Sequence, residues 1–157
     1  MGKHDPRAIL EENRYVFSRN TPEGAATAEV CLEQESVRVR LWGPGSEHLK
    51  TNLPSMIGLD QPLLAADIPG LPRALQRLRA LGLRRTLRPG ALAETLVPLI
   101  LQQLVTWREA AAIYGTLLKE LGQPAPGPFS SLVLAPTMSV FKTLTGAQLR
   151  AMNISGR

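Results

Sequence analysis

The stretch Leu92–Gly122 constrains the fold most, because it specifies two helices that meet at a short turn. Thr106 is followed three residues later by Glu109. This spacing predicts a capping box, in which each side chain binds a backbone N–H at the start of a helix. The second helix is therefore expected over Trp107–Leu121, with Gly122 in the left-handed position that ends many helices.

The first helix is expected over Leu92–Leu104, where large apolar residues recur at spacings of three and four. One side of this helix carries Leu92, Leu96, Leu99, Ile100 and Gln103. Pro98 lies about two turns into the helix and removes a backbone hydrogen bond, which predicts a local irregularity. Gln102 and Gln103 close the apolar run at the corner between the helices. A buried amide must be hydrogen-bonded, whereas one left free at a corner can bind something else.

Upstream of the helix pair, the sequence predicts a small antiparallel sheet. Two strands joined by a short hairpin are expected at Ala28–Glu33 and Val37–Leu41. The second strand alternates strictly, so Val37, Val39 and Leu41 are expected to face a core, and Arg38 and Arg40 to face water. Residues 1–20 are expected to form a frayed lead-in with a short helix around Ala8–Arg14.

Shorter helices are expected on both sides of the pair, at Glu47–Asn52, Leu71–Ala80, Met138–Leu144 and Gly146–Met152. Pro54 is expected to end the first of these. Thr145 suits the N-cap position of the last helix, and Asn153 suits its C′ position. A stiff extended loop is expected over Gln123–Pro128. The expected fold class is α+β. After the lead-in, an α+β region is expected over residues 21–88, and residues 89–157 are expected to be the opening helices of an all-α domain.

The run Ile100–Thr106, followed by Ala110–Gly122, resembles the helix pair that opens the catalytic region of the helix-hairpin-helix DNA glycosylases. The alkylated-base branch, the 3-methyladenine type II enzymes, is the most similar. In that family a Gln-Leu pair followed by Val and Ser or Thr occupies the corner, as Gln103 to Thr106 do here. The resemblance continues through Leu41–Gly45, through Leu53–Leu59, and from Pro136-Thr137 to Met152–Arg157. It covers most of the chain from about Thr21, and it rests on the order and spacing of these segments.

The resemblance implies a DNA-3-methyladenine glycosylase-like protein of base-excision repair. Such enzymes flip a damaged base out of the duplex and cleave its N-glycosidic bond. DNA-binding roles are implied for Leu104, whose counterpart wedges into the gap left by the flipped base, and for Gln103 beside it. Gln102 stands where the family usually has a small Gly. The alternative for Leu104 is a core or helix-end residue.

The family's helix-hairpin-helix and catalytic aspartate follow the segments that this chain resembles. The aspartates here are Asp5, Asp60 and Asp67, all before the central helices. We therefore expect a truncated and inactive form of a DNA N-glycosylase, a hydrolase, with no catalytic residue assigned. Two alternatives stay open: a basic helical module for DNA binding or protein interaction, and a non-functional remnant of an interrupted gene.

Positive charge is concentrated in one part of the chain, whose net charge is +5. No acidic residue lies between Asp67 and Glu94. The same stretch contains six arginines: Arg73, Arg77, Arg79, Arg84, Arg85 and Arg88. Binding to a phosphate backbone requires such a local excess. Weakly bound, non-specific double-stranded DNA is thus the expected partner, with Arg84, Arg85 and Arg88 among its contacts. The alternative is a solvated helix face.

No cofactor and no metal are expected. His4 and His48 lie far apart with no carboxylate at ligand spacing, and the sequence has no glycine-rich phosphate loop. The single Cys31 excludes an internal disulfide and a thiolate cluster. No apolar run approaches the ~18–20 residues of a membrane span, and no signal-peptide core is present, so a cytoplasmic location is expected.

The helix pair carries more apolar surface than the short helices after it are expected to cover. The residues expected to lack cover are Leu96, Ile100, Ile113, Leu117 and Leu121. Exposed apolar patches promote association, so we expect a loosely packed chain, or one that self-associates through this stripe.

Overall fold

The computed structural model describes residues 5–57, 60, 72, 73, 76, 92–103 and 105–154 of the 157-residue chain. The chain divides into two compact units, one formed by residues 1–49 and 91–157 and the other by residues 50–90. Helix α1 (Ser46–Met56) begins in the first unit and ends in the second. The domain limits expected from the sequence stay predictions.

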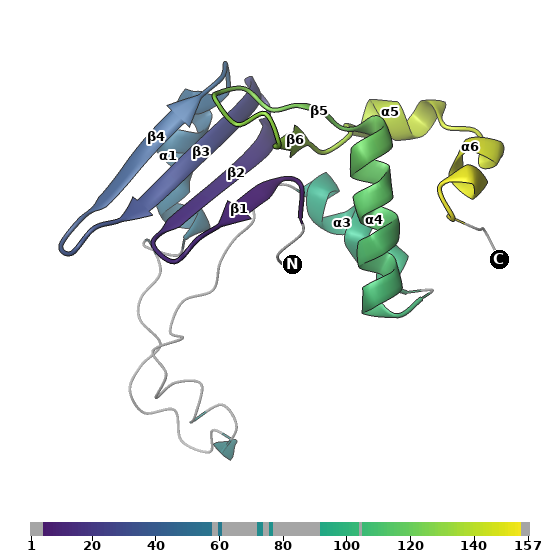
Figure 1. The fold of residues 1–157 in the computed structure, drawn as a ribbon, viewed down its shortest axis with the longest axis horizontal. Helices are drawn as coiled ribbons and strands as arrows, with labels where there is room; N and C mark the ends of the chain where they lie inside the picture. Colours follow the sequence, from purple (N-terminus) through teal and green to yellow (C-terminus); the bar gives the residue numbers. More distant parts are fainter. Residues whose placement is uncertain are drawn as a thin grey trace. The chain divides into compact units, whose positions relative to one another are not determined.

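The first unit contains a four-stranded antiparallel sheet in the order β1-β2-β3-β4 (Figure 1). Its strands are β1 (Ala8–Leu10), β2 (Arg14–Thr21), β3 (Gly24–Leu32) and β4 (Val37–Trp42). The predicted hairpin is thus confirmed as β3–β4, whereas the predicted helix around Ala8–Arg14 is wrong. Ala8 pairs with Phe17, and Leu10 pairs with Tyr15. Pairing with the next strand, β2, outweighs the weak helical tendency of this short segment.

The exposure of the side chains on β4 differs from the alternating pattern that the sequence predicted. Val37 and Val39 are 52% and 37% exposed, so their expected burial in a core is wrong. β4 is an edge strand of this sheet and pairs with β3 alone among the described strands. Leu32, the partner of Val37 across that ladder, is itself exposed.

The arginines of β4 face solvent as expected, but they also compensate a buried charge. Glu29 is 2% exposed, and its two carboxylate oxygens lie 2.6 Å from Arg14 Nε and 2.5 Å from Arg40 Nε. Arg38 forms an ion pair with Glu33. A buried carboxylate costs several kcal/mol unless it is paired, so these arginines serve the sheet.

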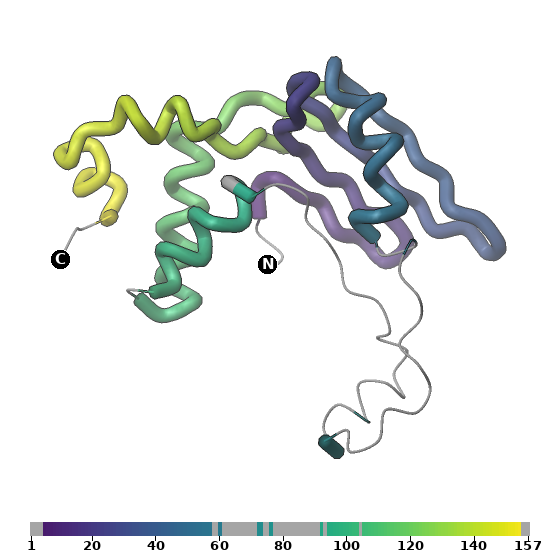
Figure 2. The backbone as a smooth tube through the Cα atoms, turned by 180° about the vertical axis from the view of Figure 1, so that it is seen from behind, coloured from purple at the N-terminus to yellow at the C-terminus, as the bar shows by residue number. Residues whose placement is uncertain are grey.

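The predicted helix pair is present as α3 (Leu92–Gln102) and α4 (Trp107–Leu121), which lie side by side in both views (Figures 1 and 2). The bounds of α4 and its capping box at Thr106 are confirmed. The left-handed conformation expected for Gly122 is wrong, because its φ is −69°. Glycine is required there for a different reason: a Cβ would lie 2.2 Å from the carbonyl oxygen of Leu118.

After α4 the chain forms a small hairpin and two short helices. Strands β5 (Gln123–Pro124) and β6 (Val133–Leu134) pair where only an extended loop was predicted. The helices predicted next are confirmed as α5 (Met138–Thr143) and α6 (Gly146–Ala151). Thr145 forms a capping box with Gln148, and Asn153 adopts the left-handed conformation, with φ at 60°.

The core beside α4 consists of buried residues from both helices and from the segment after β6: Leu101, Ala110, Tyr114, Leu117, Leu118 and Ala135. Leu117 is 1% exposed, so the expectation that it lacks cover is wrong. Leu96 and Ile100 are 42% and 54% exposed, as expected.

Two further predictions concern residues 50–90. Pro54 lies inside α1 rather than ending it. A proline near the end of a helix removes one hydrogen bond, and the last turn still closes because Ile57 N–H donates to the Leu53 carbonyl at 3.0 Å. The helix predicted over Leu71–Ala80 lies largely outside the described residues.

With a small antiparallel sheet and separate helices, the α+β fold class is confirmed.

Candidate functional site

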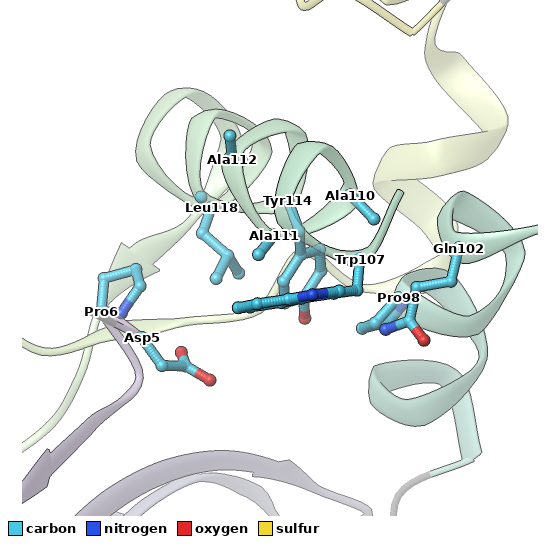
Figure 3. Close-up of a pocket in the computed structure, with 11 residues that line it drawn as sticks. Asp5, Pro6, Pro98, Gln102, Trp107, Ala110, Ala111, Ala112, Tyr114 and Leu118 are labelled. Atoms are coloured by element: carbon cyan, nitrogen blue, oxygen red, sulfur yellow. The ribbon is translucent and has the colours of Figure 1, made fainter. Parts of the chain in front are cut away.

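A pocket of about 530 Å³ opens at the α3–α4 pair (Figure 3). Its polar and aromatic lining comes from Asp5 of the N-terminal segment, Gln102 of α3, and Trp107 and Tyr114 of α4. Small and aliphatic residues of the two helices complete it. Ligand sites in proteins are typically concave spaces of ~300–1,000 Å³ with mostly apolar walls and a few polar groups, and this pocket has those properties.

The capping box positions Trp107 at the mouth of the pocket. Glu109 N–H donates to Thr106 Oγ1 at 3.4 Å, and Thr106 N–H donates to Glu109 Oε2 at 3.0 Å. The Thr106 hydroxyl also donates to Oε2 at 2.7 Å. These hydrogen bonds stabilise the carboxylate and lower the pKa of Glu109. Trp107 is the first residue of α4 and is 68% exposed, so its indole presents a broad aromatic surface.

Tyr114 lies two turns further along α4 and is almost completely buried, at 8% exposure. Its hydroxyl has no hydrogen-bond partner among the described residues. Burial raises the pKa of Tyr114 to about 12, because the phenolate would lack water, and the nearby charge of Arg7 only partly offsets this. The guanidinium Cζ of Arg7 lies 5.0 Å from the centroid of the ring. At neutral pH the hydroxyl is therefore protonated and can donate a hydrogen bond.

Asp5 is held beside the pocket by Arg7. The Arg7 backbone N–H and Nε–H donate to Asp5 Oδ1 at 3.0 and 3.1 Å, and an Nη2 hydrogen is donated to Oδ2 at 2.9 Å. Burial opposes the charged form of Arg7, but the hydrogen bond to Asp5 and the nearby negative charges, including those of Asp5 and Glu94, together outweigh this effect, so the pKa of Arg7 rises above its ordinary value.

Glu94 of α3 links that helix to the N-terminal segment and to β2. Its Oε2 lies 3.7 Å from Arg7 Nη1 and 3.8 Å from Arg19 Nε, and its Oε1 accepts from the Asn20 backbone N–H at 3.1 Å. Asn20 in turn donates from Nδ2 to the Ala135 carbonyl at 2.7 Å. The sheet, α3 and the segment after β6 therefore form one frame around the pocket.

The DNA-binding residues predicted from the sequence are only partly described. Gln103 is exposed at the end of α3, where its N–H donates to the Ile100 carbonyl at 3.1 Å. The neighbouring Gln102, also exposed, lines the pocket. Leu104, Arg84, Arg85 and Arg88 lie outside the described residues.

Three pocket residues had no functional signal in the sequence. Asp5 stands 109 positions before Tyr114, and no spacing rule joins them. Tyr114 and Trp107 read as ordinary positions of an amphipathic helix. Their roles follow only from the exposure of the indole and the burial of the phenol.

Among the described residues, no group of three histidine, cysteine or acidic side chains could hold a metal ion. No helix among these residues is long and apolar enough to cross a bilayer.

Comparison with known proteins finds similarity among solved structures. No protein-family model matches the chain, and no curated protein matches it. Among solved structures, the chain is similar to a 3-methyladenine DNA glycosylase from Archaeoglobus fulgidus, with a TM-score of 0.66 and 16% sequence identity. The similarity covers 98% of this chain and 55% of that chain. The fold is therefore glycosylase-like, and the chain spans about half the length of that structure.

Proposed function

We propose that this chain binds double-stranded DNA as a relative of the alkylated-base DNA glycosylases, the helix-hairpin-helix enzymes of base-excision repair. The observation that supports this most is the glycosylase-like fold over 98% of the chain, combined with the Gln103-Leu104 corner between α3 and α4. Gln103 is exposed there, as a residue that meets DNA must be.

Each proposed contact has a separate chemical role. Leu104 enters the gap that a displaced base leaves in the stack, because an apolar wedge there replaces lost stacking. Gln103 offers donors and an acceptor beside that gap. Arg84, Arg85 and Arg88 neutralise backbone phosphates, which gives weak binding without sequence preference.

Base release is a separate question from binding. In the resembled family an aspartate after the helix-hairpin-helix supports departure of the damaged base. No aspartate follows Asp67 in this chain, so we propose that the 157 residues alone bind DNA without cleaving the N-glycosidic bond.

Fluorescence anisotropy with a labelled duplex, measured over a range of salt concentrations, tests the phosphate contacts. If all three arginines touch phosphates, replacing Arg84, Arg85 and Arg88 together by Ala lowers the slope of log K against log salt by up to about 2.7. The control replaces Arg38, which is exposed and pairs with Glu33 on the sheet, and leaves the slope nearly unchanged. Equal slopes for the first variant and the unmodified chain would assign the three arginines to a solvated surface.

The wedge is tested with a duplex that contains an abasic site. Leu104→Ala weakens binding to this duplex more than binding to an intact one, because only the gap accepts the side chain. Met138→Ala, which removes an exposed apolar residue of α5, is the control. An equal loss on both duplexes would make Leu104 a structural residue.

The exposed side of α3 favours a second candidate function, association between copies of the chain. Leu92, Leu96, Leu99 and Ile100 are 42–80% exposed, and contiguous apolar surface of this kind marks interaction sites. Sedimentation velocity tests this candidate. Leu96→Glu with Ile100→Glu shifts the chain to monomer, whereas an unmodified chain that is monomeric at high concentration would exclude it.

A further inference from the structure

One face of the four-stranded sheet carries a row of apolar side chains that the fold leaves open. Residues directly opposite one another in an antiparallel ladder share a face. Leu10 of β1 pairs with Tyr15 of β2, and Tyr15 pairs with Val30 of β3. Val30 pairs in turn with Val39 of β4, so each strand contributes one side chain to the row. Three members are well exposed, at 76% for Leu10, 41% for Tyr15 and 37% for Val39.

Two further apolar residues extend the row toward the end of the sheet. Leu32 of β3 pairs with Val37 of β4, and each lies two positions from a member of the row. Side chains alternate along a strand, so both lie on the same face as the row. Both are more than half exposed. The six residues together are termed the apolar strip: Leu10, Tyr15, Val30, Leu32, Val37 and Val39.

The same face is closed only one row further along the strands. Phe17 and Ala28 pair with each other two positions from Tyr15 and Val30, and both are buried. The sheet therefore covers one part of this face and leaves the strip beside it open. Contiguous exposed apolar surface marks interaction sites in soluble proteins, which makes the strip a candidate docking surface.

The two connections beside the strip are acidic. The one between β1 and β2 carries Glu11 and Glu12, and the one between β3 and β4 carries Glu33 and Glu35. Both connections lie at the same end of the sheet (Figure 1), and all four side chains are exposed. Among the described residues, Glu12 and Glu35 form no ion pair.

The positive charge of this region lies on the other face of the sheet. Arg14 and Arg38 both pair in register with Cys31. Cys31 follows Val30 directly, and neighbouring side chains of a strand point to opposite faces. Both arginines therefore lie on the face away from the strip. Arg40, which follows a strip residue directly on β4, lies on that face as well.

The local charge identifies the kind of partner that the strip fits. Residues 10–15 and 29–40 contain five glutamates and three arginines, although the net charge of the chain is +5. Like charges across an interface cost affinity, whereas opposite charges steer a partner to its site. Two copies of this surface, a nucleic acid or an anionic membrane would each bring negative charge to the acidic connections. The fitting occupant is apolar on one side and cationic around it.

The length of the strip indicates a short helix. Four neighbouring strands, ~4.8 Å apart, give a row about 14 Å long, and this matches nearly three helical turns of about 5.4 Å. We propose that the apolar strip docks an amphipathic helix of a partner protein, with that helix's apolar face on the strip and its lysines or arginines beside Glu12 and Glu35. Such a helix presents its anchors at positions i, i+3 or i+4, and i+7. This docking is independent of DNA binding.

The probe is a fluorescein-labelled peptide of four helical turns, built of leucine and lysine with the leucines on one face. Fluorescence anisotropy with the full chain is expected to show binding that weakens as salt rises. A peptide with glutamate in place of every lysine is expected to bind at least about tenfold more weakly, because it repeats the charge of the acidic connections. Absence of binding by the lysine peptide, or equal affinity for both peptides, would overturn the proposal.

Two substitutions on the strip test where the peptide binds. Leu10→Thr with Val37→Thr removes exposed apolar surface and keeps β-branched residues, which suit strands. This variant is expected to bind the lysine peptide about tenfold more weakly, because less apolar area is buried in the complex. The matched control, Met138→Ala with Glu120→Gln, changes one exposed apolar residue and one exposed acid outside the sheet. The control is expected to bind as the unmodified chain does.

The acidic connections are tested separately with Glu12→Gln and Glu35→Gln in one chain. The expected loss of lysine-peptide affinity is about two- to fivefold at low salt, and it disappears at high salt. Circular dichroism and thermal melting show whether each variant is folded. Unchanged affinity in a folded strip variant would overturn the proposal. If the strip variant does not fold, unchanged affinity in the glutamine variant overturns it instead.

Other occupants of the strip would give different results. A second copy would make the unmodified chain a dimer in sedimentation velocity and the strip variant a monomer, whereas association through α3 would persist in that variant. Residues 71–80 of the chain itself would compete with the peptide, so Leu71→Ser with Leu75→Ser would tighten peptide binding. Either result would overturn the proposal of a partner helix.

Discussion

Replacing Tyr114 by Phe is expected to stabilise the chain at neutral pH. A tyrosine hydroxyl in a protein core usually donates a hydrogen bond, and its removal then costs about 1 kcal/mol. Here the hydroxyl is buried without a partner among the described residues. Its removal instead relieves a desolvation penalty, so the sign of the change is reversed.

The magnitude follows from what the substitution leaves in place. The ring keeps its contacts in the core beside α4, and Arg7 keeps an aromatic face 5.0 Å from its guanidinium carbon. An unsatisfied buried polar group costs about 1–3 kcal/mol. We therefore expect a free energy of unfolding about 1 kcal/mol higher than that of the unmodified chain. For a chain of this size this raises Tm by about 2–4 °C.

The pH dependence gives a second signature. Burial raises the pKa of Tyr114 to about 12 in the folded chain, against about 10 in an unfolded one. The fold thus favours the protonated phenol, and this contribution is complete below pH 10. Above pH 10 the unfolded chain loses the proton first, so stability falls until the folded group also ionises near pH 12. Because one pKa unit corresponds to about 1.4 kcal/mol, Tyr114 accounts for a loss of about 1–1.5 kcal/mol at pH 11, which Phe cannot show.

Urea denaturation followed by circular dichroism at pH 7 and at pH 11 measures both effects. Tyr15→Phe is the neutral-pH control, because Tyr15 is 41% exposed and its substitution should change stability by less than about 0.5 kcal/mol. Tyr114→Leu removes the ring and should be destabilising. A Phe variant that is less stable than the unmodified chain at pH 7 would show that the hydroxyl has a partner and would refute the reasoning.

Three further outcomes are expected. Gly115→Ala should raise the free energy of unfolding by about 0.5–1 kcal/mol, because a Cβ there meets no described atom within 4 Å. Gly122→Ala should lower the free energy of unfolding, because its Cβ would lie 2.2 Å from the Leu118 carbonyl oxygen. Urea denaturation of both variants checks this pair. Thr106→Ala removes the capping box and should cost about 1 kcal/mol in the same assay, and a loss near zero would show that α4 does not need its cap. Incubation of the chain with methylated duplex DNA should release no 3-methyladenine, since no aspartate follows Asp67, and release above a no-protein control would contradict this.

The helix pair was predictable because its signals are local. A capping box needs residues three positions apart, and Thr106 and Glu109 satisfied that condition before any tertiary contact was known. The same holds for Thr145 as the N-cap of the last helix, and for Asn153 after that helix. Gly122 shows the limit of such rules. Glycine was correctly placed at the helix end, but what requires it is the approach of a carbonyl oxygen from the preceding turn.

The sheet was harder to predict because each strand depends on its neighbour as well as on its own residues. Ala8 to Leu10 are too few to show an alternating pattern, and they become a strand because β2 lies beside them. Val37 and Val39 show the opposite error. Their alternation with arginines would indicate burial in a strand that has neighbours on both sides. β4 is an edge strand, so its apolar side chains stay partly exposed and the prediction of burial is wrong.

The pocket could not have been found from helix caps or from strand alternation. It depends on a frame of ion pairs and a cation–π contact that joins four segments: the N-terminal segment, β2, α3 and α4. Glu94 of α3 meets Arg7 and Arg19, and Arg7 holds Asp5 beside the Tyr114 ring. Each arginine would read as an exposed charge in the sequence, yet the side chain of Arg7 is 8% exposed and that of Arg19 is 15% exposed. Charges this buried are expensive unless paired. The frame is therefore formed only when the sheet and the helices are already in contact. The burial of the Tyr114 hydroxyl, which has no partner among the described residues, is likewise a property of the folded chain.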